Sequence, residues 1–188
     1  MSELLVAISE FDAACEAADL SYVIGGSVCS GIHSLIRNTN DVDVVLGRAL
    51  KTTDPAIAQL DQKFIVDQIA LEQNHLQGRC YNIFHEESAI KFDLFPPIGE
   101  FQRAQLERAV IVRPTSSPRP FRIASVEDII MAKLNWLHQS HSERQEQDIL
   151  GLLSVNKNKI DFSYIANWSE KFSVSALLSD LRSRVEDE

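Results

Sequence analysis

The sequence predicts an α/β fold of the α+β kind, in which a mixed β-sheet is flanked by helices and a helical part follows at the C-terminus. Up to about residue 113, short apolar stretches of period two alternate with stretches of helical period. Beyond about residue 120, every apolar pattern is helical. We therefore expect a core at 1–113 and a C-terminal helical region at 121–188 packed on it, separated by the Pro-rich loop 114–120.

The chain is expected to open with an amphipathic helix that ends near residue 20. Apolar side chains recur there at helical spacing, at Leu4, Ile8, Phe11 and Cys15. A short strand at 22–24 follows and is broken by Gly25 and Gly26. Ser27 is placed as the N-cap of a helix that runs towards residue 36.

A strand is predicted at 41–46, because Val42, Val44 and Leu46 alternate with Asp41, Asp43 and Val45 in the period of two that gives a strand two different faces. Pro55 suits the first turn of a helix to about residue 63, and a further helix is expected at 67–75. The remaining predicted elements of the core are strands at 81–85 and 90–95 joined as a hairpin, a helix at 101–108 and a strand at 110–112.

The C-terminal region is predicted to hold four helices. Ser125 followed by Asp128 resembles a capping box, so the first helix should begin there and continue to about residue 137. The others are expected at 142–155, 161–172 and 174–185.

Composition narrows the classes of function. The 188 residues are 45% hydrophobic and 24% charged, and no apolar run approaches the roughly 20 residues that span a bilayer. The start of the chain lacks the basic residues of a secretory signal, so we expect a cytoplasmic protein without a membrane partner. Three scattered cysteines suggest neither a disulfide framework nor a zinc site.

The formal net charge of −9 disfavours long nucleic acid as a partner, because affinity for a phosphate backbone depends on lysine and arginine. The arginine-rich stretch 103–122 could still form a local basic groove. Alternatively, its arginines lie on a solvated loop and helix face: Arg103, Arg108, Arg113, Arg119 and Arg122.

Three carboxylates form the candidate catalytic and metal-binding centre. Asp41 and Asp43 are two residues apart on one strand, so both project from the same face. Their mutual repulsion would be offset most simply by a divalent cation. Asp93 on a second strand could join them, and three such carboxylates can hold two ions about 3.5–4 Å apart for phosphoryl transfer. Alone, the Asp41 and Asp43 pair would suit a solvated strand edge.

The segment before this pair is a candidate phosphate site. Gly25 and Gly26 allow close approach of the backbone, while Ser27 and the following helix N-terminus offer a hydroxyl and N–H groups to an anion. Each feature alone is weak. Their order along the chain is far more specific: strand, Gly-Gly-Ser, helix, Asp-Val-Asp strand, then a strand with a third Asp.

In this order of motifs, the chain resembles the nucleotidyltransferases of the DNA-polymerase-β-like superfamily. It looks nearest to the bacterial branch related to abortive-infection (AbiEii-like) nucleotidyltransferase toxins. Further segments carry the resemblance to about residue 170, including 37–40, 81–85, 91–95, 124–128 and 142–148. In that branch an acidic residue commonly follows the Arg of the last motif, whereas here Gln145 follows Arg144.

The resemblance implies a nucleotidyltransferase fold and roles for individual residues. Ser27 would contact the triphosphate of an NTP, Asp41 and Asp43 would bind Mg²⁺, and Asp93 would help to activate the acceptor. Lys133 and Asp148 match a Lys and an Asp that the toxin-like branch uses.

Two of these positions have alternative interpretations. Lys133 shares a helical face with Ile129, Ile130, Trp136 and Leu137, so it could bind phosphate or form a structural ion pair with Asp148. Arg37 could reach a phosphate or cap the strand.

The leading hypothesis is a Mg²⁺-dependent enzyme that transfers a nucleoside monophosphate from an NTP to an acceptor hydroxyl and releases pyrophosphate. The unknown acceptor could be a small molecule, a protein side chain or an RNA end, and the acidic charge favours the first two. The alternative is a catalytically inert binding module with this fold, or one component of a toxin–antitoxin pair with a protein partner.

Overall fold

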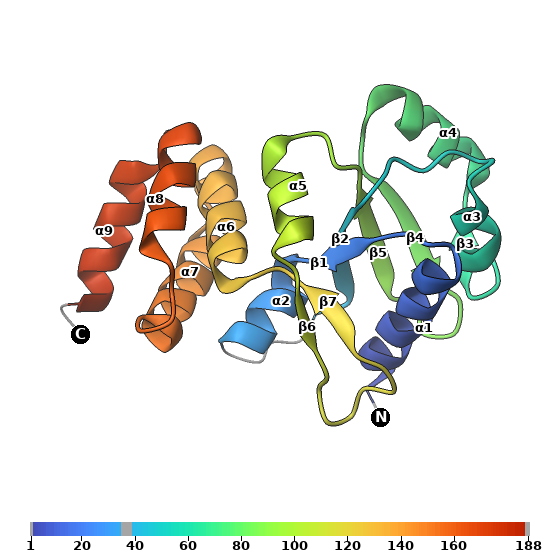
Figure 1. Cartoon of the computed structure of the whole chain (residues 1–188), viewed down its shortest axis with the longest axis horizontal. Coiled ribbons are helices and arrows are strands. Elements are labelled where there is room, and N and C mark those ends of the chain that lie inside the picture. The colour runs from blue at the N-terminus through green and yellow to red at the C-terminus, as the bar shows by residue number, and fades with distance from the viewer. Residues whose placement is uncertain (1, 35–38, 187–188) are drawn as a thin grey trace. The chain divides into compact units, whose positions relative to one another are not determined.

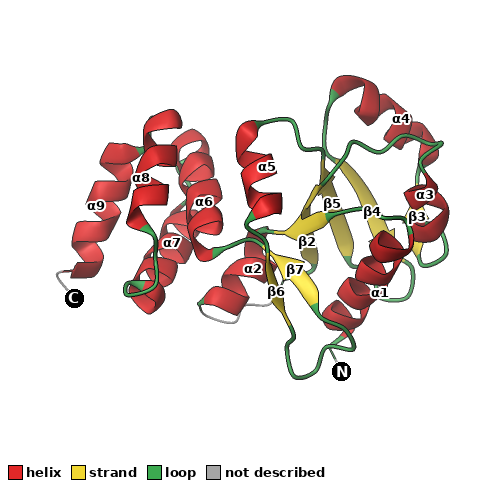
Figure 2. Cartoon of the chain, in the orientation of Figure 1, coloured by secondary structure: helices red, strands yellow, loops and turns green. Residues whose placement is uncertain are grey.

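The computed structural model describes residues 2–34 and 39–186, which divide into two compact units (Figure 1). Residues 1–28 and 38–124 make up the first unit, and residues 29–37 and 125–188 the second. Helices and strands alternate in the first unit, whereas the described part of the second is helical (Figure 2). The boundary falls after Ala124, because residues 121–123, which we expected to begin the helical region, form a strand of the sheet.

A seven-stranded mixed sheet forms the centre of the first unit. Its strands lie in the order β3-β4-β5-β2-β1-β7-β6, with β2 parallel to β5, β1 parallel to β7 and the other neighbours antiparallel. They are β1 (Tyr22–Ile24), β2 (Asp41–Leu46), β3 (Phe64–Val66), β4 (Tyr81–His85), β5 (Lys91–Phe95), β6 (Val110–Val112) and β7 (Phe121–Ile123).

Five helices begin within this unit: α1 (Glu3–Ala17), α2 (Gly26–His33), α3 (Pro55–Leu60), α4 (Gln68–Gln77) and α5 (Glu100–Glu107). Asp54 and Asp67 cap α3 and α4, because each side chain accepts a hydrogen bond from a backbone N–H in the first turn. Beyond residue 28, α2 belongs to the second unit.

Aromatic side chains form the core between α1 and the sheet. Phe11 of α1 stacks on Phe92 of β5, with ring centroids 5.0 Å apart, and meets Tyr22 of β1 edge-on at 5.3 Å. Phe64 of β3 lies 5.2 Å from Phe92. These rings are almost fully buried, so this face of the sheet belongs to the core of the unit.

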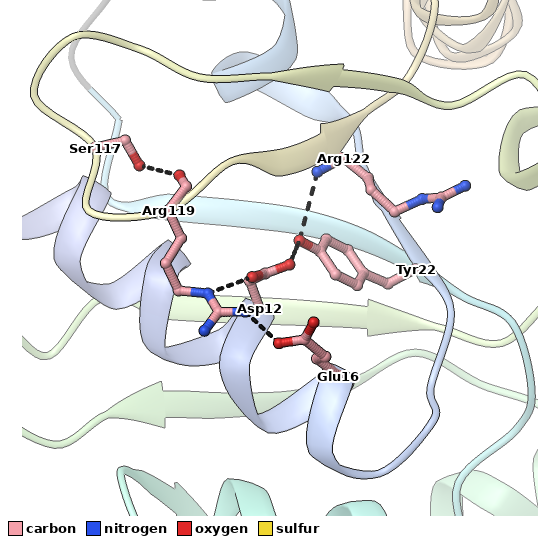
Figure 3. Close-up of polar contacts among 6 residues, drawn as sticks. All are labelled: Asp12, Glu16, Tyr22, Ser117, Arg119 and Arg122. Atoms are coloured by element: carbon pink, nitrogen blue, oxygen red, sulfur yellow. Dashed lines mark hydrogen bonds and ion pairs between the residues drawn. The ribbon is translucent and has the colours of Figure 1, made fainter.

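An ion-paired cluster joins the loop 114–120 to α1 (Figure 3). Arg119 donates a hydrogen bond of 2.8 Å to Asp12 and another to Glu16. The Tyr22 hydroxyl donates to the other oxygen of Asp12 at 2.8 Å and accepts from the backbone N–H of Arg122. Arg119 therefore holds the loop in place through ion pairs with α1, a role that neither the basic groove nor the solvated face had predicted.

The second unit contains the helices α6 (Val126–Ser140), α7 (Glu143–Asn156), α8 (Phe162–Lys171) and α9 (Ser175–Glu186). Ser125 caps α6 as predicted, since its hydroxyl oxygen accepts from the backbone N–H of Asp128. The buried Asp128 carboxylate in turn accepts from the Tyr164 hydroxyl at 2.6 Å, which ties α8 to α6. Asn156 of α7 donates to the carbonyl oxygen of His33, so residues 29–34 group with these helices.

Three details differ from the sequence predictions. No strand was predicted at β3 or β7, but both pair with neighbours in the sheet. Helix α2 begins at Gly26, so Ser27 lies inside the first turn instead of capping it. Trp136, predicted to face the core, is 56% exposed.

Candidate active site

The carboxylates of Asp41 and Asp43 lie on one side of β2. Along this strand Val42, Val44 and Leu46 are buried, while Asp41 is exposed and Asp43 is half-buried. The alternation arises because successive side chains of a strand point to opposite faces. The two acids are thus on the face of the sheet opposite to the aromatic core.

Asp93 lies beside this pair on the neighbouring strand. Strands β2 and β5 run parallel with Asp43 opposite Asp93 and Asp41 opposite Lys91. The Lys91 ammonium is 2.9 Å from Asp93 Oδ2 and 3.4 Å from Asp41 Oδ1, so one cation bridges two of the three acids. The hydrogen bond to Asp93 raises the pKa of Lys91 above its ordinary value, which keeps the ammonium charged.

Asn82 of β4 completes this row of polar side chains. It is opposite Asp93 in the antiparallel pair of β4 and β5, and its side-chain nitrogen donates to Asp93 Oδ1. Sequence reasoning assigned no role to Asn82 or Lys91. The alternation of β5 places Lys91 and Asp93 on one face, but the contact with Asn82 depends on the register of a hairpin, which the sequence does not reveal.

Gly26 brings the start of α2 against Asp43. The backbone of Gly26 has a φ of +55°, and a Cβ added there would lie 1.7 Å from Asp43 Oδ2. The N–H of the preceding Gly25 donates to the carbonyl oxygen of Asp43 at 2.8 Å. Only a residue without a side chain fits between this turn and the carboxylate. Ser27 follows in the first turn of α2, and Arg37 lies outside the described residues.

Lys133 and Asp148 belong to the second unit and contact each other. The Lys133 ammonium lies 2.8 Å from Asp148 Oδ2 and donates to the side-chain oxygen of Gln145 at 2.9 Å. Only 5% of the Lys133 side chain is exposed. This arrangement favours the structural ion pair among the two interpretations of Lys133.

Cys80 precedes β4 and lies near the same acids. Burial raises the pKa of its thiol to about 12, and the negative charges of Asp93 and Asp43 act in the same direction. The thiol is therefore protonated at neutral pH and is a poor nucleophile or metal ligand.

Asp41, Asp43 and Asp93 offer carboxylate oxygens, which are ligands of the kind that Mg²⁺ takes. Within residues 2–34 and 39–186, no group of three or more His, Cys, Asp or Glu side chains is arranged to hold a metal ion by itself. Mg²⁺ usually takes one or two carboxylates, keeps several waters and uses substrate phosphates as further ligands. Asp41 and Asp43, with Asp93 on the adjacent strand, would therefore need phosphate and water oxygens to complete a Mg²⁺ site.

A helix that spans a membrane must be both long and apolar. None of the helices in the described ranges combines the length and the apolar character that crossing a membrane requires.

Comparison with known proteins yields structural likeness without a sequence match. No protein-family model matches the chain, and no curated protein matches it. Among solved structures, the chain is similar to an antigenic nucleotidyltransferase-like protein from Paracoccidioides brasiliensis, with a TM-score of 0.55 and 18% identity over 96% of this chain and 92% of that one. ANT(2'')-Ia in complex with adenylyl-2''-tobramycin aligns with a TM-score of 0.49 and 15% identity, over 99% of this chain and 98% of that one.

The likeness to the Paracoccidioides protein extends over nearly the whole of both chains, so it includes the sheet and the C-terminal helices. It agrees with the fold that the order of motifs predicted. The chain therefore has a nucleotidyltransferase fold, with a mixed seven-stranded sheet flanked by helices and a helical C-terminal part.

Proposed function

We propose that the protein is a nucleotidyltransferase that transfers a nucleoside monophosphate from an NTP to an acceptor hydroxyl and releases pyrophosphate. The observation that carries the proposal is the row Asn82, Asp93 and Asp43 across three adjacent strands, with the Gly26 turn against Asp43. A phosphate-binding turn and a carboxylate row are the two parts that nucleotidyl transfer needs. The fold shared with a nucleotidyltransferase-like protein supports the same activity.

The triphosphate would bind at the start of α2. Backbone N–H groups at a helix N-terminus point outwards and attract anions, and the Ser27 hydroxyl adds a further donor there. Asp41 and Asp43 would hold Mg²⁺ together with phosphate oxygens, and two ions are expected if Asp93 shares one of them. Bound Mg²⁺ neutralises charge on the transferred phosphorus and on the leaving pyrophosphate.

Asp93 is the proposed general base. The acceptor oxygen forms a bond to the α-phosphorus, and its proton passes to Asp93. The bond from the α-phosphorus to the bridging oxygen breaks, and pyrophosphate leaves with that electron pair. In the free protein, Asn82 and Lys91 each donate to one oxygen of Asp93, so they fix the orientation of the carboxylate before the nucleotide binds.

The acceptor is proposed to be a small molecule or a protein side chain in preference to an RNA end, since a net charge of −9 opposes binding of polyanions. Membership of the toxin-related branch, with a protein antitoxin as partner, stays a prediction from the sequence resemblance.

Calorimetric titration with a non-hydrolysable NTP, with and without MgCl₂, tests the proposal. We expect binding that requires Mg²⁺ and is abolished in Asp43→Asn. Asp61→Asn, which makes the same charge change at an exposed position, should bind as the natural protein does. Binding that needs no metal would favour the inert module instead.

Thermal melts without metal separate a site role of Asp43 from a structural one. Replacing this carboxylate by a neutral amide relieves repulsion between neighbouring anions, so Asp43→Asn should be as stable as the natural protein or more stable. A large loss of stability would instead identify Asp43 as a residue needed for folding.

A further inference from the structure

The ammonium of Lys91 lies among the acids of the candidate site. It contacts Asp93 of its own strand at 2.9 Å and Asp41 of the adjacent strand at 3.4 Å. Asp93 is only 16% exposed at its side chain and Asp41 is 58% exposed, so the bridge joins a largely buried carboxylate to a solvent-exposed one. A single positive charge here offsets part of the repulsion between the carboxylates.

Both carboxylate oxygens of Asp93 already have donors. Oδ2 faces Lys91, and Oδ1 accepts from the neutral side chain of Asn82. A divalent cation held by Asp93 would lie close to the Lys91 ammonium, and two positive charges close together in a partly buried site repel strongly. Binding of the metal and the Lys91 contact with Asp93 are therefore mutually opposed.

We propose that Lys91 is a tethered counter-cation that holds Asp41 and Asp93 in place and is displaced when a divalent cation arrives with the nucleotide. This inference rests on the proposed function, because it assigns the carboxylates to metal binding. The displaced ammonium has a new partner in the phosphate oxygens of the NTP, since lysine is a common phosphate ligand. Metal alone must compete with Lys91, whereas metal and nucleotide together provide a partner for it.

The consequence is a positive coupling between metal and nucleotide. Each ligand raises the affinity for the other by the same factor, as linkage requires. Removal of the Lys91 charge should strengthen binding of metal alone and reduce this coupling.

The test measures binding of Mn²⁺, as a spectroscopic substitute for Mg²⁺, by the loss of the electron paramagnetic resonance signal of the free ion. Lys91→Met retains much of the side-chain volume, and Lys91→Arg retains the positive charge. Lys63→Met is the matched control, because Lys63 is also an ion-paired lysine of the same unit, with Glu10 as its partner. Far-UV circular dichroism establishes that each variant is folded.

Without nucleotide, Lys91→Met should bind Mn²⁺ about tenfold more tightly than the natural protein, which corresponds to about 1.4 kcal/mol of binding free energy. Lys91→Arg and Lys63→Met should bind it as weakly as the natural protein. Addition of a non-hydrolysable NTP should raise the Mn²⁺ affinity of the natural protein more than that of Lys91→Met.

Two outcomes overturn the inference in different ways. Equal Mn²⁺ affinities of Lys91→Met and the natural protein, with NTP-dependent metal binding in both, would refute the role of Lys91 and leave the proposed function standing. Absence of Mn²⁺ binding in every variant, even with NTP, would refute the proposed function as well. If Lys91→Met does not fold, tighter Mn²⁺ binding by Lys91→Gln takes its place as the expected result, and unchanged binding refutes the inference.

Discussion

The ion pair of Lys133 and Asp148 allows the two interpretations of Lys133 to be separated by stability measurements. The ammonium lies 2.8 Å from Asp148 Oδ2 and 2.9 Å from the side-chain oxygen of Gln145. Lys133→Met keeps most of the aliphatic stem but removes the charge, so the Asp148 carboxylate loses its ion pair with the Lys133 ammonium. Asp148→Asn has the converse effect and leaves a buried ammonium without its anion.

The expected loss of stability follows from the burial of the Lys133 and Asp148 ion pair. Breaking a buried ion pair by removing one partner costs about 3–5 kcal/mol, because the remaining charge is poorly solvated. Lys133 is 5% exposed and Asp148 is 14% exposed, so water reaches the carboxylate slightly and we expect Lys133→Met to cost roughly 3 kcal/mol, at the lower end of that range. At about 2–4 °C per kcal/mol for a chain of this size, the melting temperature should fall by roughly 6–12 °C.

The assay is a thermal melt of the two single variants and the double variant Lys133→Met with Asp148→Asn, followed by circular dichroism. The double variant should recover much of the loss, because neither charge is then left without its partner. Lys159→Met, a change at an exposed lysine of the same unit, should melt as the natural protein does.

Strictly additive losses in the single and double variants would refute the structural ion pair. Normal melting of Lys133→Met together with weaker NTP binding in calorimetry would instead assign Lys133 to the nucleotide site. Strong coupling with unchanged NTP affinity would remove Lys133 and Asp148 from that site.

Two further predictions concern the first unit. Gly26→Ala should abolish Mg²⁺-dependent NTP binding in calorimetry, since its Cβ would lie 1.7 Å from Asp43 Oδ2. Gly25→Ala, whose Cβ meets no atom within 4 Å, should melt normally. Normal NTP binding by Gly26→Ala would contradict the candidate site. The Arg48 hydrogen bond holds the pKa of Asp54 below its ordinary value of 3.8, so the stabilisation by Asp54 is complete above that pH and is lost as pH falls through the lower, folded-state value. Asp54→Ala should therefore lower the melting temperature at pH 5 to 7 and much less near pH 3, and a difference independent of pH would refute this linkage.

Most helices and strands could be predicted because their signals are local. Asp54 with Pro55 begins α3 as the sequence indicated, and the alternation of 41–46 matches the bounds of β2. The strands β3 and β7 were missed because three residues are too few to show a period, and neither is followed by a break such as Gly25 and Gly26, which marked the equally short β1. Their strand conformation depends on partners far away in the sequence: β7 pairs with β1, about a hundred residues earlier.

The candidate site was predictable in part for the same reason. Two residues on one strand share a face by local geometry, so Asp41 and Asp43 could be grouped from sequence. The position of Asp93 opposite Asp43 requires the register of β2 and β5, and the contact of Asn82 requires that of β4 and β5. Register is set by tertiary pairing, and a one-residue shift would turn each side chain of the strand to the opposite face of the sheet.

Repulsion among the acids is partly offset by a residue of the chain itself. Two carboxylates on one strand face were expected to need a divalent cation, but Lys91 supplies a positive charge from the chain itself. Its β5 position opposite Asp41 makes this possible, because a lysine stem is long enough to reach both neighbouring acids. A carboxylate row that is already partly neutralised can fold before any metal binds. The same neutralisation opposes a metal that arrives alone, so stability of the free protein and metal affinity depend on Lys91 in opposite directions.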